Sequence, residues 1–392
     1  MTHGVSRRSF FGGMAAAIGY LGVGKEIDLF AQGQARGAGA ARAGAVSNDY
    51  DSFAHLSSNE NCWGAPESVM KAMNNAWKYS NRYGYPDGGI VAEIAKHHDV
   101  KPENILLTAG SGEVLDVVGT TFLPAGKKVL GVTPSYGSVY QHATSIKSEA
   151  ITLPLDKNYR QDIPAMIKAA NAHAAELGFV YVCNPNNPTG VIVTSKEVKQ
   201  LLDGIPKDMP VLIDEAYHHF VDSPDYESSM KYVLEGRPVI VCRTFSKIAA
   251  LAAMRLGYGI APAELIKKVR TFTTGSQSIT VKFGGAASIK DTAGQAKTKA
   301  LNKQIREDTI AKLRALGHEV LPSEANFFMV GLKREVSDVA PEFQKRDVMV
   351  GRPFAPMTQH LRVSVGTQAE MDKFMAAFKE IMAAPAKTAA AV

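Results

Sequence analysis

The chain has few cysteines and no pattern of metal ligands. Its 392 residues include Cys62, Cys183 and Cys242, whose spacing matches neither a zinc site nor a disulfide scaffold. Two pairs of adjacent histidines, at 97–98 and 218–219, do not point to one face of a regular element, which argues against metal binding by either pair alone. We therefore expect no metal cofactor.

Clusters of positive charge and long apolar runs are also missing. The formal net charge is +6, and no basic cluster indicates binding to nucleic acid or to a membrane surface. The apolar stretch that ends near residue 23 is too short and too rich in glycine for a stable membrane span. The composition is that of a soluble enzyme, and the length suffices for two domains.

The N-terminal segment carries the pattern of an export signal. The run Ser-Arg-Arg-Ser-Phe-Phe at 6–11 is followed by the weakly apolar stretch and by an Ala/Gly-rich tract at 31–45. This pattern predicts a twin-arginine signal and linker over residues 1–45, handled by the twin-arginine export machinery, with the periplasm as destination. A chance Arg-Arg in a disordered basic tail is the alternative. The route carries folded proteins, which suits an enzyme that loads its cofactor before export.

From about residue 85 the chain alternates between apolar strand-like runs and amphipathic helices. This alternation predicts a mostly parallel sheet with helices on both faces. The expected strands are 105–108, 128–132, 179–184, 211–214, 239–243 and 256–261, and the expected helices include 67–77, 163–175, 195–203 and 263–272. From about residue 297 the pattern is α+β, with a helix to 316, strands near 318–321, 327–330 and 362–365, and a helix over 369–383. We predict an arm with part of a small domain over 46–84, a large domain over 85–296, the rest of the small domain over 297–385, and a tail over 386–392.

Several polar residues lie at the ends of the predicted strands. Lys247 ends the run Arg-Thr-Phe-Ser-Lys, Asp214 and Tyr217 follow an apolar run, and Asn187 lies in a loop rich in turn formers. Each alone is unremarkable, since a lone lysine after a serine is usually a surface residue. Together, in this order, they are the residue types that hold pyridoxal phosphate (PLP).

The chemistry of PLP explains these residue types. PLP is an electron sink while its ring nitrogen is protonated, so an acid must lie beside that nitrogen, and Asp214 is the candidate. A carboxylate at the end of a buried strand is costly unless it meets a cation, which the pyridinium supplies. Lys247 must be neutral to form the Schiff base, and burial and nearby cations lower a lysine pKa. Once substrate displaces it, the free amine can move the α-proton as base and acid.

With these motifs the chain resembles the fold-type I, PLP-dependent aminotransferases of class I/II, and within them it is most similar to the histidinol-phosphate aminotransferases. The similarity extends from about Leu56 to about Phe378. It implies an α/β fold with a large domain built on a mostly parallel seven-stranded sheet and a smaller α+β domain. It also implies a homodimer that acts on small-molecule amino acids and 2-oxo acids.

The resemblance implies a role for each matching residue. Lys247 forms the Schiff base, Asp214 partners the ring nitrogen, and Asn187 and Tyr217 bond the ring hydroxyl oxygen. Further cofactor contacts are implied for three residues of a glycine-rich turn before a helix, Ser111, Gly112 and Glu113, and for Tyr136. Phosphate contacts are implied for Arg255 and for Thr244, Ser246 or both. Tyr83, or alternatively Tyr85, is implied to reach the cofactor of the neighbouring subunit. A glycine-rich turn at a helix N-terminus also presents backbone amides that suit a phosphate.

Substrate binding is implied for Arg362, which matches the family arginine for the α-carboxylate or an equivalent anion. It lies in an alternating run that predicts a half-buried strand; a strand-end surface cation is the alternative. Trp63 and Cys62 replace the usual tyrosine and proline of an Asn-Glu-Asn motif, so Trp63 either lines an aromatic or apolar substrate pocket or is core. Arg352 lies close to where histidinol-phosphate enzymes place a phosphate-binding arginine. These departures put histidinol phosphate itself in doubt.

The function predicted from the sequence is a PLP-dependent aminotransferase that works in two half-reactions through Lys247. One alternative keeps the cofactor but changes the reaction, to a decarboxylase or a racemase. A non-catalytic binding protein on the PLP fold is a further alternative, and the intact Lys247, Asp214 and Arg362 argue against it.

Overall fold

A computed structural model describes residues 50–384 apart from 86 and 125. The predicted export signal, at 1–45, lies outside the described residues. Contacts divide the chain into the units Met1–Asp51 and Ser52–Val392, and the fold described below is that of the second unit.

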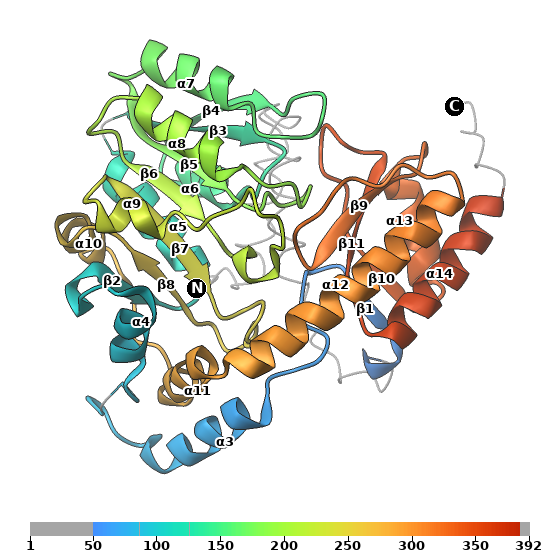
Figure 1. Cartoon of the computed structure of the whole chain (residues 1–392), viewed down its shortest axis with the longest axis horizontal. Helices are drawn as coiled ribbons and strands as arrows, with labels where there is room; N and C mark the ends of the chain where they lie inside the picture. The colour runs from blue at the N-terminus through green and yellow to red at the C-terminus, as the bar shows by residue number, and fades with distance from the viewer. Residues whose placement is uncertain (1–49, 86, 125, 385–392) are drawn as a thin grey trace, which may run out of the picture. The chain divides into compact units, whose positions relative to one another are not determined.

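A seven-stranded sheet forms the larger part of this unit (Figure 1). The strand order is β2-β8-β7-β6-β5-β3-β4, and β8 alone runs against the others. The strands are β2 (Ile105–Thr108), β3 (Lys128–Thr133), β4 (Glu149–Pro154), β5 (Leu177–Cys183), β6 (Val211–Asp214), β7 (Val239–Thr244) and β8 (Gly257–Ile260). The mostly parallel seven-stranded sheet predicted from the sequence is confirmed.

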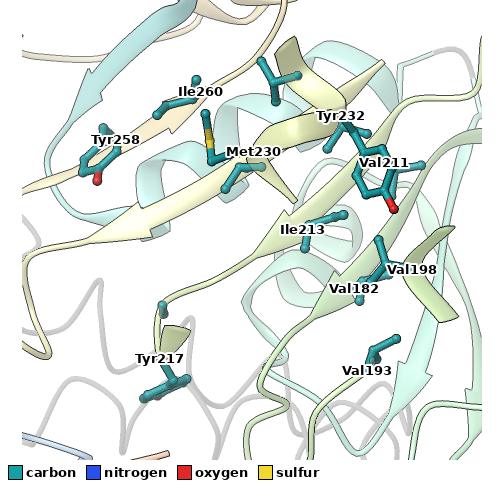
Figure 2. Close-up of a cluster of buried hydrophobic side chains, with 14 of the residues drawn as sticks. Val182, Val193, Val198, Val211, Ile213, Tyr217, Met230, Tyr232, Tyr258 and Ile260 are labelled. Atoms are coloured by element: carbon teal, nitrogen blue, oxygen red, sulfur yellow. The ribbon is translucent and has the colours of Figure 1, made fainter. Parts of the chain in front are cut away.

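Helices cover both faces of this sheet because its central strands are buried on both sides. Alternate residues of β5 pack into two separate cores: Phe179 and Tyr181 face one, Val180 and Val182 the other. Figure 2 shows part of the second core, where Val182 meets Val211 and Ile213 from the neighbouring strand.

The helices of this part are α3 (Glu67–Ala76), α4 (Ile90–His98), α5 (Ser111–Phe122), α6 (Ser138–Ser145), α7 (Ile163–Ala172), α8 (Ser195–Gly204), α9 (Met230–Leu234), α10 (Ala263–Arg270) and α11 (Ile279–Lys290). Short 3₁₀ helices are η1 (Tyr50–Ser52), η2 (Trp77–Tyr79), η3 (Pro102–Asn104) and η4 (His218–Phe220). Local sequence explains where several begin. At α8, Thr194 accepts from the amide of Glu197 over 3.2 Å and Glu197 accepts from the amide of Thr194 over 2.8 Å, a capping box.

A second group of elements surrounds a core of its own. Its elements are β1 (Ala54–Leu56), α12 (Thr292–Ala315), β9 (Phe327–Gly331), α13 (Val336–Gln344), β10 (Val348–Val350), β11 (His360–Ser364) and α14 (Gln368–Ala383). β1 pairs in parallel with β10, and β11 pairs antiparallel with β9. Segments from both ends of the described chain therefore build this core. The helix α12 contacts η4 beside the large sheet as well as β9 and α14 (Figure 1).

Four differences from the sequence-based prediction concern strands, and two of them are the short strands β1 and β10, which were not predicted. The strand expected near 318–321 is wrong, because only Val320 forms a bridge, to Val330, before the chain turns away. Strand β4 was not predicted: it lies at the edge of the sheet with no fully buried residue, so it lacks the apolar run that marks the central strands. The predicted domain boundaries stay predictions.

Candidate active site

The predicted cofactor residues meet at one edge of the large sheet. Strands β5 and β6 end in register at Cys183 and Asp214, and β6 pairs in parallel with β7. The loops that follow these strands carry Asn187, Tyr217 and Lys247. Because the carboxyl ends of parallel strands share one edge, three segments spread over 60 residues converge there.

Asp214 lies at this edge with 3% of its surface exposed. Its carboxylate accepts a 3.1 Å hydrogen bond from the amide of Ala216, and the Tyr181 hydroxyl lies 3.5 Å away. Burial raises its pKa to about 6, because the charged form has lost its hydration. A cation beside it would favour the ionised form, which is what a protonated ring nitrogen provides.

Lys247 has the properties of an amine poised to react. Burial, followed by the nearby guanidinium of Arg362, lowers its pKa to about 8. Its Nζ donates a 3.1 Å hydrogen bond to the carbonyl oxygen of Ser58 and lies 5.7 Å from the centre of the Tyr217 ring. A substantial fraction of the amine is therefore neutral, and hence nucleophilic, near neutral pH.

The Tyr217 hydroxyl is the centre of a buried hydrogen-bond network. It accepts from Nδ2 of Asn187 over 3.2 Å and from Nδ2 of Asn59 over 3.1 Å. Asn187 in turn accepts from Nη1 of Arg362 over 2.6 Å. The ring of Tyr217 packs edge-on against Phe327, with 4.9 Å between ring centres. Two predicted ring-oxygen ligands and the predicted substrate arginine thus form one connected set.

An anion cradle lies beside this network, at the start of α5. Gly110 has φ of +89°, and a Cβ there would come within 2.2 Å of Nη2 of Arg255. Arg255 lies across from the first turn of α5, which begins at Ser111 and continues with Gly112, and its Nη1 lies 3.5 Å from Oγ of Ser246. Backbone amides at a helix N-terminus, a guanidinium and a hydroxyl are the donors that a phosphate needs.

The predicted cofactor contact of Glu113 is not supported by its surroundings. Its carboxylate accepts from the amide of Ala109 over 2.6 Å and from the amide of Thr274 over 2.9 Å. Its own amide donates to the carbonyl oxygen of Gly110 over 3.3 Å. Glu113 therefore ties the 271–278 loop to the start of α5, and a carboxylate would repel a phosphate. Thr244 also bonds within the chain, accepting from the amide of Ser246 over 3.1 Å.

Three predicted tyrosines differ in their exposure. Tyr136 keeps 40% of its surface exposed, and its pKa is raised by burial of the hydroxyl and by Asp214. Tyr85 stacks on Tyr79 with 3.6 Å between ring centres, whereas Tyr83 is fully exposed. The tyrosine that points away from its own chain is therefore Tyr83.

The substrate arginine Arg362 lies on β11 and is 8% exposed. Its Nη2 donates to the carbonyl oxygen of Ser57 over 2.5 Å, but its buried Nε has no partner among the residues that the structure describes. Burial lowers its pKa to about 10, so it stays cationic at neutral pH. The centre of the Phe354 ring lies 4.8 Å from the guanidinium carbon of Arg362 and 4.4 Å from that of Arg352, so both guanidinium groups contact one ring. Trp63 packs against the core of the second group of elements.

Two functional features were missed by the sequence reasoning. Asn59 belongs to the Asn-Glu-Asn motif, but its link to Tyr217 became visible only in the structure. The pair Arg243 and Glu215, each next to a predicted site residue, forms a 2.7 Å buried ion pair between β7 and the end of β6. Adjacency to Thr244 and Asp214 was the only signal in the sequence.

The described residues form neither a metal site nor a membrane span. Within the part of the chain that the structure describes, no group of three or more His, Cys, Asp or Glu side chains is arranged to hold a metal ion. None of the described helices combines the length and the apolar character needed to cross a bilayer.

Comparison with known proteins identifies the family. The family model for aminotransferase class I and II matches residues 52–378. The chain belongs to the class I and II aminotransferases. The match spans both groups of elements and every site residue described above.

Individual relatives agree with this assignment. The aminotransferase is 33% identical over 337 residues to a histidinol-phosphate aminotransferase from Moorella thermoacetica, covering 84% of this chain and 85% of that protein. A histidinol-phosphate aminotransferase structure from Sinorhizobium meliloti in complex with pyridoxal-5'-phosphate has a TM-score of 0.77 at 24% identity, covering 84% and 91% of the two chains. L-threonine-O-3-phosphate decarboxylase from Porphyromonas gingivalis shares the fold, with a TM-score of 0.72 at 21% identity over 84% and 99%.

The cofactor of this aminotransferase is pyridoxal phosphate, and the described residues fit it. At the cradle, the lack of a Cβ at Gly110 lets the guanidinium of Arg255 approach the start of α5, which places a cation beside a helix N-terminus and suits a phosphate. Asp214 is a buried carboxylate that forms no ion pair within the described residues, which suits a pyridinium. Lys247 is the amine for the covalent link.

Proposed function

We propose that this aminotransferase acts on amino compounds with an anionic group that Arg362 binds, either the carboxylate of an amino acid or the phosphate of an amine such as histidinol phosphate. The observation that carries this proposal is the buried Nε of Arg362, which has no partner within the described residues. A buried N–H left unpaired is costly, and a planar anion would satisfy it together with a neighbouring N–H. The name shared by the curated relatives, histidinol-phosphate aminotransferase, supports a phosphorylated amine among the substrates.

Arg352 provides for a second anionic group. Its guanidinium donates to the carbonyl oxygen of Pro353 over 3.0 Å, and no carboxylate of the described residues forms an ion pair with it. It contacts the same Phe354 ring as Arg362. Two cations that share one ring, and form no ion pair with a carboxylate of the described residues, repel each other, and a ligand with two anionic groups would relieve that repulsion.

The side chains divide the work of transamination. PLP, when bound, supplies an electron sink for the negative charge that develops next to the substrate nitrogen. Asp214 keeps the ring nitrogen protonated, and Asn187 and Tyr217 donate to the ring oxygen. Arg362 orients the substrate by its anionic group, and Nζ of Lys247 moves the α-proton.

An absorbance titration of the PLP-loaded protein tests this function. The panel should contain aromatic and dicarboxylic amino acids and histidinol phosphate. Conversion of the visible cofactor band to the pyridoxamine phosphate band by one member identifies that member as a donor. Release of carbon dioxide without a keto acid would instead indicate the decarboxylase alternative. An Arg362→Lys protein titrated in parallel should need far higher concentrations of the same donor.

The enzyme is proposed to be a homodimer in which Tyr83 reaches the cofactor of the second subunit. Tyr83 is fully exposed, and Met70 of α3 and Trp77 of η2 keep 46% and 61% of their surface exposed. Sedimentation should give a dimer, and Trp77→Glu should shift it toward monomer. Loss of PLP affinity in Tyr83→Ala but not in Tyr85→Ala would assign the reaching tyrosine.

Export by the twin-arginine route to the periplasm is the last part of the proposal. Its support is the run Ser-Arg-Arg-Ser-Phe-Phe at 6–11. The test is cell fractionation of the full chain and of a variant with Arg7→Lys and Arg8→Lys together. Periplasmic activity that is lost in the variant would support export, and the N-terminal sequence of the mature protein would locate the cleavage site. If the full chain and the variant were retained equally in the cytoplasm, export by this route would be contradicted.

A further inference from the structure

Asn59 joins strand β11 to the Tyr217 hydroxyl. Its Nδ2 donates to that hydroxyl over 3.1 Å, while its Oδ1 accepts from Oγ of Ser364 over 3.1 Å and its amide donates to the same Oγ over 2.8 Å. Asn59 and Ser364 are each 1% exposed. These bonds are removed from water, which strengthens them and makes their directions matter.

The hydrogen bonds around Tyr217 leave its hydroxyl able to donate one further hydrogen bond. A hydroxyl has two acceptor sites and one proton to donate. Asn59 and Asn187 fill both acceptor sites. No acceptor for the proton is found among the residues that the structure describes, so the proton is left for a ligand in the site.

Two parallel relays therefore link β11 to Tyr217. One starts at Arg362 and passes through Asn187; the other starts at Ser364 and passes through Asn59. Arg362 and Ser364 are two residues apart on one strand, so their side chains lie on the same face. Apart from Tyr217, where both relays end, the second relay uses no residue to which the sequence analysis assigned a role.

We propose that Asn59 is a positioning residue: with Asn187 it fixes the Tyr217 hydroxyl as a donor toward the cofactor's ring oxygen, and through Ser364 it ties that orientation to the strand that carries Arg362. This inference rests on the proposed function, because it needs PLP against Tyr217. Asn59 itself touches neither substrate nor cofactor.

A purely conformational role for Asn59 is the alternative. Its φ is +54°, a left-handed conformation that asparagine tolerates better than most residues. The backbone is held independently, however, because Nδ2 of Asn326 donates to the carbonyl oxygens of Asn59 and Glu60 over 3.0 and 3.2 Å. Glycine at position 59 would keep this conformation without strain and would remove only the side-chain relay.

Asn59→Gly therefore separates the two roles. The full chain is loaded with PLP, and the absorbance of the bound cofactor is followed against pH. A hydrogen-bond donor to the cofactor's ring oxygen stabilises the negative charge on that oxygen most when the Schiff-base nitrogen has lost its proton. Weakening the donor therefore raises the apparent pKa of the Schiff base, which is read from the absorbance band. One weakened hydrogen bond corresponds to an upward shift of about 0.5 to 1 pH unit, with PLP release faster by about three- to tenfold.

Asn59→Ala should give the same shift with an added loss of stability, because alanine is strained at this φ. Ser364→Ala breaks the relay one step earlier and should shift the pKa in the same direction by less. Asn302→Ala is the matched control. Asn302 is also 1% exposed, and its side-chain Nδ2 donates to the carbonyl oxygen of Ala325 over 3.3 Å and not to Tyr217. Its band should keep the wild-type pKa.

The outcomes are distinct. An apparent pKa of the absorbance band that is raised in Asn59→Gly and Ser364→Ala, and unchanged in the control, supports the positioning role. An Asn59→Gly band that titrates as in the wild type overturns it, and if that variant does not fold, an unshifted Ser364→Ala does so. Absence of a visible band in the wild type itself would instead refute the proposed function.

Discussion

The Nη1 atom of Arg362 donates a 2.6 Å hydrogen bond to Oδ1 of Asn187, 175 residues earlier in the chain. The bond joins β11 of a two-stranded sheet to the loop after β5 of the seven-stranded sheet. Asn187 also donates to the Tyr217 hydroxyl. One buried asparagine therefore sets the substrate arginine and the ring-oxygen ligand relative to each other.

Arg362→Lys tests the value of the guanidinium geometry. A lysine cannot donate to Asn187, to Ser57 and to a substrate anion from one plane, so it should bind an anionic substrate without bidentate contact. Loss of one charge-assisted hydrogen bond, about 2–3 kcal/mol, corresponds to a rise in KM of about 30- to 150-fold, larger than the fall in kcat. Steady-state kinetics on a donor found by titration would measure it, with Arg346→Lys on the surface as a control that changes neither. A KM that stays within threefold would contradict this role.

Loading of PLP should depend on pH through Lys247. Because its pKa is lowered to about 8, roughly one amine in ten is neutral at pH 7, against about one in three thousand for an ordinary lysine. The rate of covalent attachment to cofactor-free protein should rise with pH up to about 8 and then level off. Borohydride trapping at a series of pH values would follow it.

Two outcomes would speak against this reading of Lys247. One is a rate that keeps rising to pH 10, which would mean an unperturbed amine. The other is covalent PLP in Lys247→Ala, which should take up none and should lose transamination.

The buried pair Arg243 and Glu215 should be a major determinant of stability. Its side chains are 3% and 0% exposed, and Glu215 also accepts from the amide of Ser229 over 2.7 Å. Glu215→Gln leaves the guanidinium buried without a counter-charge, which costs about 3–5 kcal/mol. Urea unfolding would measure the loss in free energy. Lys199→Ala, which breaks a surface pair with Asp203, should leave the transition unchanged.

Buried histidines should make the protein sensitive to acid. Burial, followed by Arg243, lowers the pKa of His98 to about 2 and holds the pKa of His218 and His219 well below the usual range. Below pH 6.5 the unfolded chain binds protons at these positions and the folded chain does not. Their contribution to stability is therefore full above pH 6.5 and falls as pH drops, by about 1.4 kcal/mol per unit for each histidine.

Urea unfolding between pH 7 and pH 5 would measure this slope. His98→Gln should make it shallower, because the histidine bonds only the Tyr258 hydroxyl, over 3.0 Å, and glutamine can replace that bond without titrating. Asp214 acts in the opposite direction between about pH 4 and pH 6, since its raised pKa makes the folded state the better proton acceptor. Stability that is unchanged down to pH 5 in both proteins would contradict the role of the histidines.

Central strands and the residues at their ends could be predicted because their signals are local. The apolar run before Asp214 marks β6 by itself, and the turn formers around Asn187 mark a loop. The edge strand β4 could not be predicted in this way, because no side chain along it is fully buried. The expected strand at 318–321 shows the converse: the segment bonds to β9 around Val320 but forms a single bridge instead of a strand.

The sequence by itself determined which chemical groups stand at the strand ends, because each strand and its following turn are specified by neighbours in the chain. Only the tertiary structure decided how those groups connect. Asn59 meets Ser364 across 305 residues, and Glu113 holds a loop across 161, so no local pattern could reveal either contact. The proposal of Tyr83 in place of Tyr85 also depends on packing, since Tyr85 stacks on Tyr79 of its own chain.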